Sequence, residues 1–194
     1  MDDLNRTFVG IRLPADVQSK LAEVQQVVRH RAGSDVVRFA NPHELQLVIL
    51  ALGELTVATL DQVHRTITPL LPQFRPFELT VDGLGGSPSM LQPRFVWAGI
   101  GGDVAELTKL HNIIEANLIS ILRDYHARPF QPHIDLGRMK IESEQNRTAL
   151  GRAIKMSQVG YVASLNVSSI ETFRSTATPA GPTLEPITIY RLDA

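Results

Sequence analysis

The sequence contains no cysteine, which excludes disulfides, thiolate zinc sites and cysteine nucleophiles and is consistent with a reducing compartment. It also lacks a charge bias, because 19 lysines and arginines stand against 20 aspartates and glutamates, for a formal net charge of −1. Any contact with a long polyanion must therefore be local. There is no apolar run near the roughly 18 residues of a membrane span, and nothing resembles a signal peptide. We expect a cytoplasmic protein that makes no membrane contact.

The 194 residues are enough for a sizeable core, and 43% of them are hydrophobic. Runs rich in β-branched and aromatic residues alternate with segments whose apolar residues recur at helical spacing. Because no linker-like change of composition interrupts the chain, the pattern predicts an α+β (mixed α/β) fold in a single domain, residues 1–194. Strands are predicted at 7–13, 36–39, 45–52, 77–81, 94–100, around 133–136, 162–173 and 183–192, with a connection at 174–182, and helices at 14–31, 59–71, 103–125 and 143–156.

Several glycines and histidines are interpreted as structural. The run 83–86 does not match the Gly-x-x-x-x-Gly-Lys-Ser/Thr pattern of a phosphate-binding loop, so we expect a loop that needs positive φ. His30, His64, His111 and His126 lie on or at the ends of predicted helices without an acidic partner at metal-ligand spacing, so they are expected to be surface or helix-end residues rather than ligands. The sequence has no Gly-x-Ser-x-Gly nucleophile elbow, although this does not exclude a Ser/His/Asp triad.

The stretch 130–138 is typical of a turn that leads into a short strand. On such a strand His133 and Asp135 share one face, while Ile134 and Leu136 point into the core. An imidazole beside a carboxylate is half of an acid–base site. Two ligands are too few to define a metal site, so no metal and no other cofactor are assigned.

An internal repeat in the sequence indicates where the other half of the acid–base site lies. Gln46 and Val48, on the near-continuously apolar strand 45–52, align with His133 and Asp135 at a separation of 87 residues. Both strands follow a long helix and a proline turn, which suggests two duplicated lobes facing each other across a cleft. Strand 45–52 is expected to be covered on both faces. His43 lies three residues before Gln46, which reverses the face, so it is a poor substitute unless the turn bends it inward.

Eight short segments, taken in order, resemble a known family across nearly the whole chain: 6–11, 42–45, 52–54, 77–79, 82–85, 93–99, 130–133 and 181–183. The family is the 2H phosphoesterases, specifically the RNA 2′,3′-cyclic phosphodiesterases historically called 2′-5′ RNA ligases. The resemblance implies a bilobal fold whose two central strands each carry a His-x-Thr/Ser motif beside a cleft. It also implies metal-free chemistry on RNA ends or small cyclic nucleotides, with no obligate protein partner evident. One histidine would activate water, the other would protonate the departing ribose oxygen, and the hydroxyls would hold phosphate oxygens.

This sequence keeps one of the four motif positions. His133 matches the second histidine, whereas Gln46 replaces the first, and Val48 and Asp135 replace the two hydroxyl residues. Glutamine cannot titrate, and a general acid or base typically contributes on the order of 10²–10⁴-fold in rate. The Asp135 carboxylate repels phosphate and favours the protonated form of His133. Arg138 matches a basic position after the second motif and can hold phosphate through two hydrogen bonds.

These substitutions leave the enzymatic activity open between hypotheses of different classes. The first is an RNA 2′,3′-cyclic phosphodiesterase whose activity is weakened or altered. The second is a catalytically inactive member that binds RNA ends or nucleotides, or serves as a scaffold. A third is hydrolysis through His133, Asp135 and a metal ion.

Overall fold

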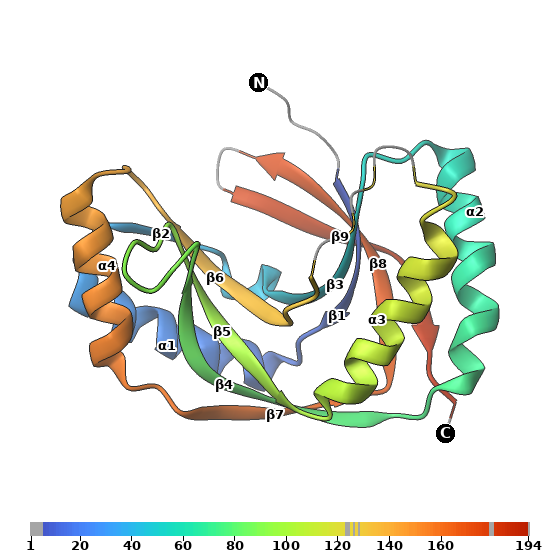
Figure 1. Cartoon of the computed structure of the whole chain (residues 1–194), viewed down its shortest axis with the longest axis horizontal. Helices are drawn as coiled ribbons and strands as arrows, with labels where there is room; N and C mark the ends of the chain where they lie inside the picture. Colours follow the sequence, from blue (N-terminus) through green and yellow to red (C-terminus); the bar gives the residue numbers. More distant parts are fainter. Residues whose placement is uncertain (1–5, 123–124, 126, 128, 179–180, 194) are drawn as a thin grey trace.

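The computed structural model describes residues 6–122, 125, 127, 129–178 and 181–193 and has the expected α+β architecture (Figure 1). The helices are α1 (Ala15–Ala32), α2 (Val57–Ile67), α3 (Val104–Leu118) and α4 (Glu144–Ser157), with 3₁₀ turns η1 (Pro42–Glu44) and η2 (Thr68–Gln73). The strands are β1 (Arg6–Arg12), β2 (Val37–Phe39), β3 (Gln46–Gly53), β4 (Phe77–Ser87), β5 (Phe95–Gly102), β6 (His133–Met139), β7 (Tyr161–Val167), β8 (Ser169–Thr178) and β9 (Gly181–Arg191).

The strands form two antiparallel sheets, a four-stranded one in the order β3-β1-β8-β9 and a five-stranded one in the order β2-β6-β5-β4-β7. Figure 1 shows α1 and α4 on the outer side of the five-stranded sheet, and α2 and α3 on the outer side of the other. Helix α1 follows β1 yet packs against α4 and β7, while α3 follows β5 yet packs against α2 and β3. Each sheet is therefore covered partly by a helix that leaves a strand of the other sheet.

The buried core is continuous from one sheet to the other. The apolar faces of α1 and α3 supply much of it, because their buried residues recur at the helical spacing seen in the sequence. Burying one such side chain contributes about 1.5–3 kcal/mol. None of the helices in the described ranges is long and apolar enough to cross a membrane. The core positions on these two helices are Val17, Leu21, Val24, Val28, Leu107, Leu110, Ile114 and Leu118.

The two sheets repeat one pairing register. Arg12 on β1 pairs with Gln46 on β3, and Gly99 on β5 pairs with His133 on β6, so both partners are shifted by the same 87 residues. An irregularity of the register follows at the equivalent step in each pair of strands. The internal repeat in the sequence therefore corresponds to a repeat in the structure. Two residues further along the motif strands, Gly10 pairs with Val48 and Trp97 pairs with Asp135.

The glycine-rich run is part of a strand, and the prediction of a loop was wrong. Strand β4 continues through it to Ser87, with only Gly83 at a positive φ (68°) within the run. Gly85 faces the ring of Trp97, and a Cβ atom there would lie 2.0 Å from the ring atom Cη2. This glycine allows close packing by the indole rather than a turn.

Other predicted bounds also need correction. The predicted strand 162–173 is two strands, β7 and β8, which enter different sheets, and the connection predicted at 174–182 is largely strand. Helix α3 ends at Leu118 instead of near residue 125. Strand β3 is not covered on both faces, because it lies at the edge of its sheet with Gln46 and Val48 half-buried and Ala51 exposed.

Of the histidines expected to be surface or helix-end residues, His111 is buried within α3, and His64, in the last turn of α2, is half-buried. His111 is 4% exposed and stacks on Phe130, with ring centroids 4.1 Å apart. The half-buried His64 makes a hydrogen bond with the Tyr190 hydroxyl. Burial lowers the pKa of His64, against the opposing charge of a nearby carboxylate. Of the other two, His30 is exposed as predicted, and His126 lies outside the described residues.

Candidate functional site

The four motif positions lie on two strands that approach each other where the sheets meet. Strands β3 and β6 are in contact and begin at Gln46 and His133, respectively. The alternate residues on both strands are buried in the core, so the motif side chains point to the opposite face. Among the described residues no hydrogen bond joins Gln46 to His133. The buried alternates are Leu47, Ile49, Ile134 and Leu136.

His133 is held by two oxygen atoms. Its Nδ1 lies 2.6 Å from the carbonyl oxygen of Gln131, which can only accept, so Nδ1 carries a proton. Its Nε2 lies 3.5 Å from Oδ1 of Asp135, an ion-pair distance when the ring is charged. Asp135, helped by the Gln131 carbonyl, raises the pKa of His133 although partial burial opposes the shift. The arrangement suits a phosphate-binding cation or a general acid better than a base.

Replacing Asp135 with Asn is expected to lower the pKa of His133, because the neutral amide no longer favours the imidazolium. The imidazole proton resonances, followed by NMR as a function of pH, would report the change. A raised folded-state pKa stabilises the fold below the unfolded value, and this contribution is lost as pH rises through the folded value. Asp35→Asn is the matched control, since Asp35 is an exposed carboxylate paired with Lys140. A His133 titration unchanged in Asp135→Asn would contradict this assignment.

Gln46 lies in a small pocket of about 80 Å³. Its Oε1 is buried and accepts no hydrogen bond from the described residues. A buried acceptor without a donor costs about 1–3 kcal/mol, so this oxygen favours a donor group of a ligand or a water. The same amide turned by 180° would present its NH₂ group instead. The pocket is lined by Arg12, Gln18, His43, Glu44, Leu45, Gln46, Phe173 and Leu184.

Arg12, which lines this pocket, forms an ion pair that joins β1 to β8. Arg12 donates from Nη2 to Glu171 at 2.9 Å and from Nε to both carboxylate oxygens at 3.1 Å. Glu171 is only 5% exposed, and the Arg12 guanidinium also lies over the Phe173 ring at 5.3 Å. The charge of Arg12 is therefore committed to Glu171 rather than free for an incoming anion.

The sequence alone does not point to Arg12, Glu171 or Phe173, because they belong to no motif and come from distant strands. His43 lines the pocket after all, because η1 curls the chain before β3 while the His43 N–H donates to Oδ1 of Asn41.

The remaining predicted residues are exposed or half-buried. Asp135 keeps 69% of its side chain exposed, and Arg138 is exposed at the far end of β6. Val48 is half-buried opposite Gly10. In the part of the chain that the structure describes, no three histidine or acidic side chains gather to hold a metal ion. The metal-dependent hypothesis therefore has no described ligand set beyond His133 and Asp135.

The arrangement of two pseudo-equivalent sheets, each with a motif strand where the sheets meet, is that of a phosphoesterase fold. A model of the 2′-5′ RNA ligase superfamily matches residues 14–178. The chain belongs to this superfamily, the 2H phosphoesterases.

Similar proteins cover almost the full length of the chain. The RNA 2′,3′-cyclic phosphodiesterases of Methanothermobacter thermautotrophicus and Archaeoglobus fulgidus are each 25% identical, over 96% and 95% of this chain and 98% and 99% of theirs. The crystal structure of TT0787 of Thermus thermophilus has a TM-score of 0.77 at 25% identity, covering 96% of this chain and 97% of that one. Escherichia coli LigT complexed with 3′-AMP has a TM-score of 0.75 at 20% identity, covering 98% and 99%, and is similar in fold.

Proposed function

We propose that this protein binds RNA ends that carry a 2′,3′-cyclic phosphate and hydrolyses them far more slowly than a site with two histidines would. The observation that carries the proposal is the shared register of Gln46 and His133, which hold equivalent places on β3 and β6. Only one of these places has an imidazole. Two relatives named as RNA 2′,3′-cyclic phosphodiesterases, and the 3′-AMP bound to LigT, support the ligand class.

The substitutions at the motif positions should weaken hydrolysis more than they weaken binding of the RNA end. A protonated His133 attracts the phosphate of the RNA end, and the Arg138 guanidinium, at the far end of β6, can attract a phosphate further along the strand. The Gln46 amide can hydrogen-bond a phosphate or ribose oxygen but cannot take a proton from water. Attack on the cyclic phosphate then lacks a base, which costs on the order of 10²–10⁴-fold in rate. Asp135 weakens the binding by repulsion, moderated by its exposure to solvent.

Hydrolysis at an altered site is the second candidate. His43, an exposed residue of η1, lines the same pocket as Gln46, on the side of the site where the motif histidine is missing. Residual turnover would then depend on both His43 and His133, with the second protonating the departing ribose oxygen.

The test compares one short RNA in two forms, ending in a 2′,3′-cyclic phosphate or in free hydroxyls, by fluorescence anisotropy, with products followed by chromatography. We expect at least about tenfold preference for the cyclic end. It should fall in His133→Ala and as pH rises through the pKa of His133, because the ring loses its charge. Equal affinity for both ends would contradict the proposal. Turnover lost in both His43→Ala and His133→Ala, but not in the control His30→Ala, would favour the second candidate.

A further inference from the structure

A row of exposed cationic and aromatic side chains crosses the five-stranded sheet beyond His133. Arg138 on β6 lies directly opposite Arg38 on β2 and, on its other side, opposite Phe95 on β5. Both arginines are exposed, and Phe95 keeps 38% of its surface accessible. Directly opposed residues of antiparallel strands lie on the same face of a sheet. We call Arg38, Arg138 and Phe95 the arginine row.

The arginine row shares a face with the candidate site. Trp97 pairs with Asp135, and Phe95 lies two residues from Trp97 on the same strand, so their side chains point the same way. The ring centroid of Trp97 is 5.7 Å from that of His133. A ligand held at His133 can therefore continue along β6 over this face.

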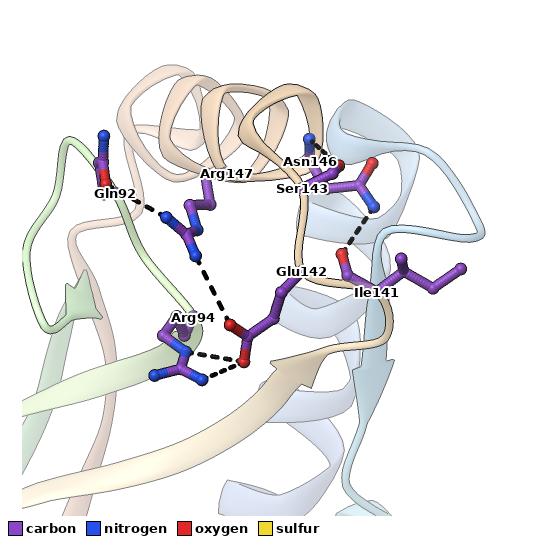
Figure 2. Close-up of polar contacts among 7 residues, drawn as sticks. All are labelled: Gln92, Arg94, Ile141, Glu142, Ser143, Asn146 and Arg147. Carbon is purple, nitrogen blue, oxygen red and sulfur yellow. Dashed lines mark hydrogen bonds and ion pairs between the residues drawn. The ribbon is translucent and has the colours of Figure 1, made fainter.

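The two arginines of the row are free cations within the described part of the chain. Neighbouring cations are occupied: Figure 2 shows Glu142 shared by Arg94 and Arg147, with Arg94 Nε 2.8 Å from its carboxylate. Arg38 and Arg138, in contrast, form no ion pair or hydrogen bond with the side chains that the structure describes. Like charges directly opposite each other destabilise a sheet, and an anion between them would remove that cost.

We propose that the arginine row binds the RNA strand on the 5′ side of the end held at His133, so that the ligand is an oligonucleotide rather than a mononucleotide. This rests on the proposed function. A phosphate would lie between Arg38 and Arg138, and a base would stack on Phe95, the combination that binds single strands elsewhere.

The length of β6 and the charged side chains beside it fit an RNA strand that runs from His133 to Arg138. From His133 to Arg138 the strand spans roughly 16 Å, long enough for several nucleotides at the stacked spacing of about 3.4 Å. Two acidic side chains near this path already face cations, because Asp135 pairs with His133 and Glu142 pairs with Arg94 and Arg147. A local basic surface is what RNA contact requires in a chain whose net charge is −1.

The test measures the affinity for a 2′,3′-cyclic mononucleotide and for a six-nucleotide RNA with the same end, at several salt concentrations. We expect the six-nucleotide RNA to bind at least about tenfold more tightly. Arg38→Gln and Phe95→Ala should each remove much of that advantage and leave mononucleotide binding unchanged. Arg38→Gln should also reduce the slope of log affinity against log salt by about 0.7, whereas Arg38→Lys should keep it. Arg75→Gln, which removes an exposed charge elsewhere, is the matched control.

A six-nucleotide RNA that binds no more tightly than the mononucleotide would overturn the proposal, as would an advantage that Arg38→Gln and Phe95→Ala leave intact. These outcomes differ from failure of end recognition, in which RNAs with cyclic and hydroxyl ends bind alike. Thermal unfolding of each variant would verify that these surface substitutions leave the fold unchanged.

Discussion

A variant combining Gln46→His, Val48→Thr and Asp135→Thr is expected to hydrolyse a 2′,3′-cyclic nucleotide at least about 10²-fold faster than the unchanged protein. The substitutions would supply the missing proton-transfer group and two hydroxyls that donate to phosphate oxygens. They would also remove the carboxylate beside the anion. The register repeat supports this design, because Gln46 and His133 already hold equivalent backbone positions. Turnover of a 2′,3′-cyclic nucleotide, followed by chromatography with and without a chelator, gives the measurement.

Single substitutions serve as controls for this variant. Gln46→His alone should gain less, since Val48 still offers no hydroxyl and Asp135 still repels phosphate. Threonine differs little in shape from valine, and Val48 is only half-buried, so the added hydroxyl should not disturb packing. Adding His133→Ala to the triple variant should abolish the gained activity. A triple variant that folds, binds the nucleotide and still does not hydrolyse it would show that more than these side chains separates this site from an active one.

The sequence predicts the elements well where local periodicity and buried positions coincide. Helix α1 and strand β6 have the expected positions because their apolar residues repeat with the correct period and their neighbours are polar or turn residues. The prediction of a loop at the glycine run 83–86 was wrong because Gly85 packs against Trp97 on the next strand. Sequence spacing does not reveal that contact. The prediction of one strand at 162–173 was wrong because only Ser168 separates the two strands, and a break of one residue does not reveal that they enter different sheets.

The residues of the candidate site also form two groups, those that the sequence predicts and those that it does not. Gln46 and His133 could be found because a duplicated unit leaves an offset that can be read along one chain. Arg12 and Phe173, which line the pocket, and Glu171, which pairs with Arg12, could not be found, because their contacts depend on pairing between β1 and β8, which are distant in sequence. His43 was judged by strand alternation, but it lies in a 3₁₀ turn, where alternation does not apply.

Arg12→Ala is expected to lower the free energy of unfolding by about 2–3 kcal/mol, because it leaves the buried Glu171 carboxylate without its cation. Breaking a fully buried pair costs about 3–5 kcal/mol, but the Arg12 side chain is 48% exposed, so solvent screening reduces the effect. For a chain of this size the expected fall in melting temperature is roughly 4–12 °C. Chemical and thermal unfolding would measure it.

The control separates a structural role for Arg12 from a role in binding. Glu171→Gln added to Arg12→Ala should recover part of the lost stability, since the buried charge is gone and the shape is kept. If stability is not recovered, the loss comes from packing on Phe173 rather than from the unpaired charge. Glu171→Gln alone would free the Arg12 guanidinium beside Gln46. Tighter binding of the cyclic end in that variant would mean that Glu171 normally withholds from the ligand a cation that the pocket already contains.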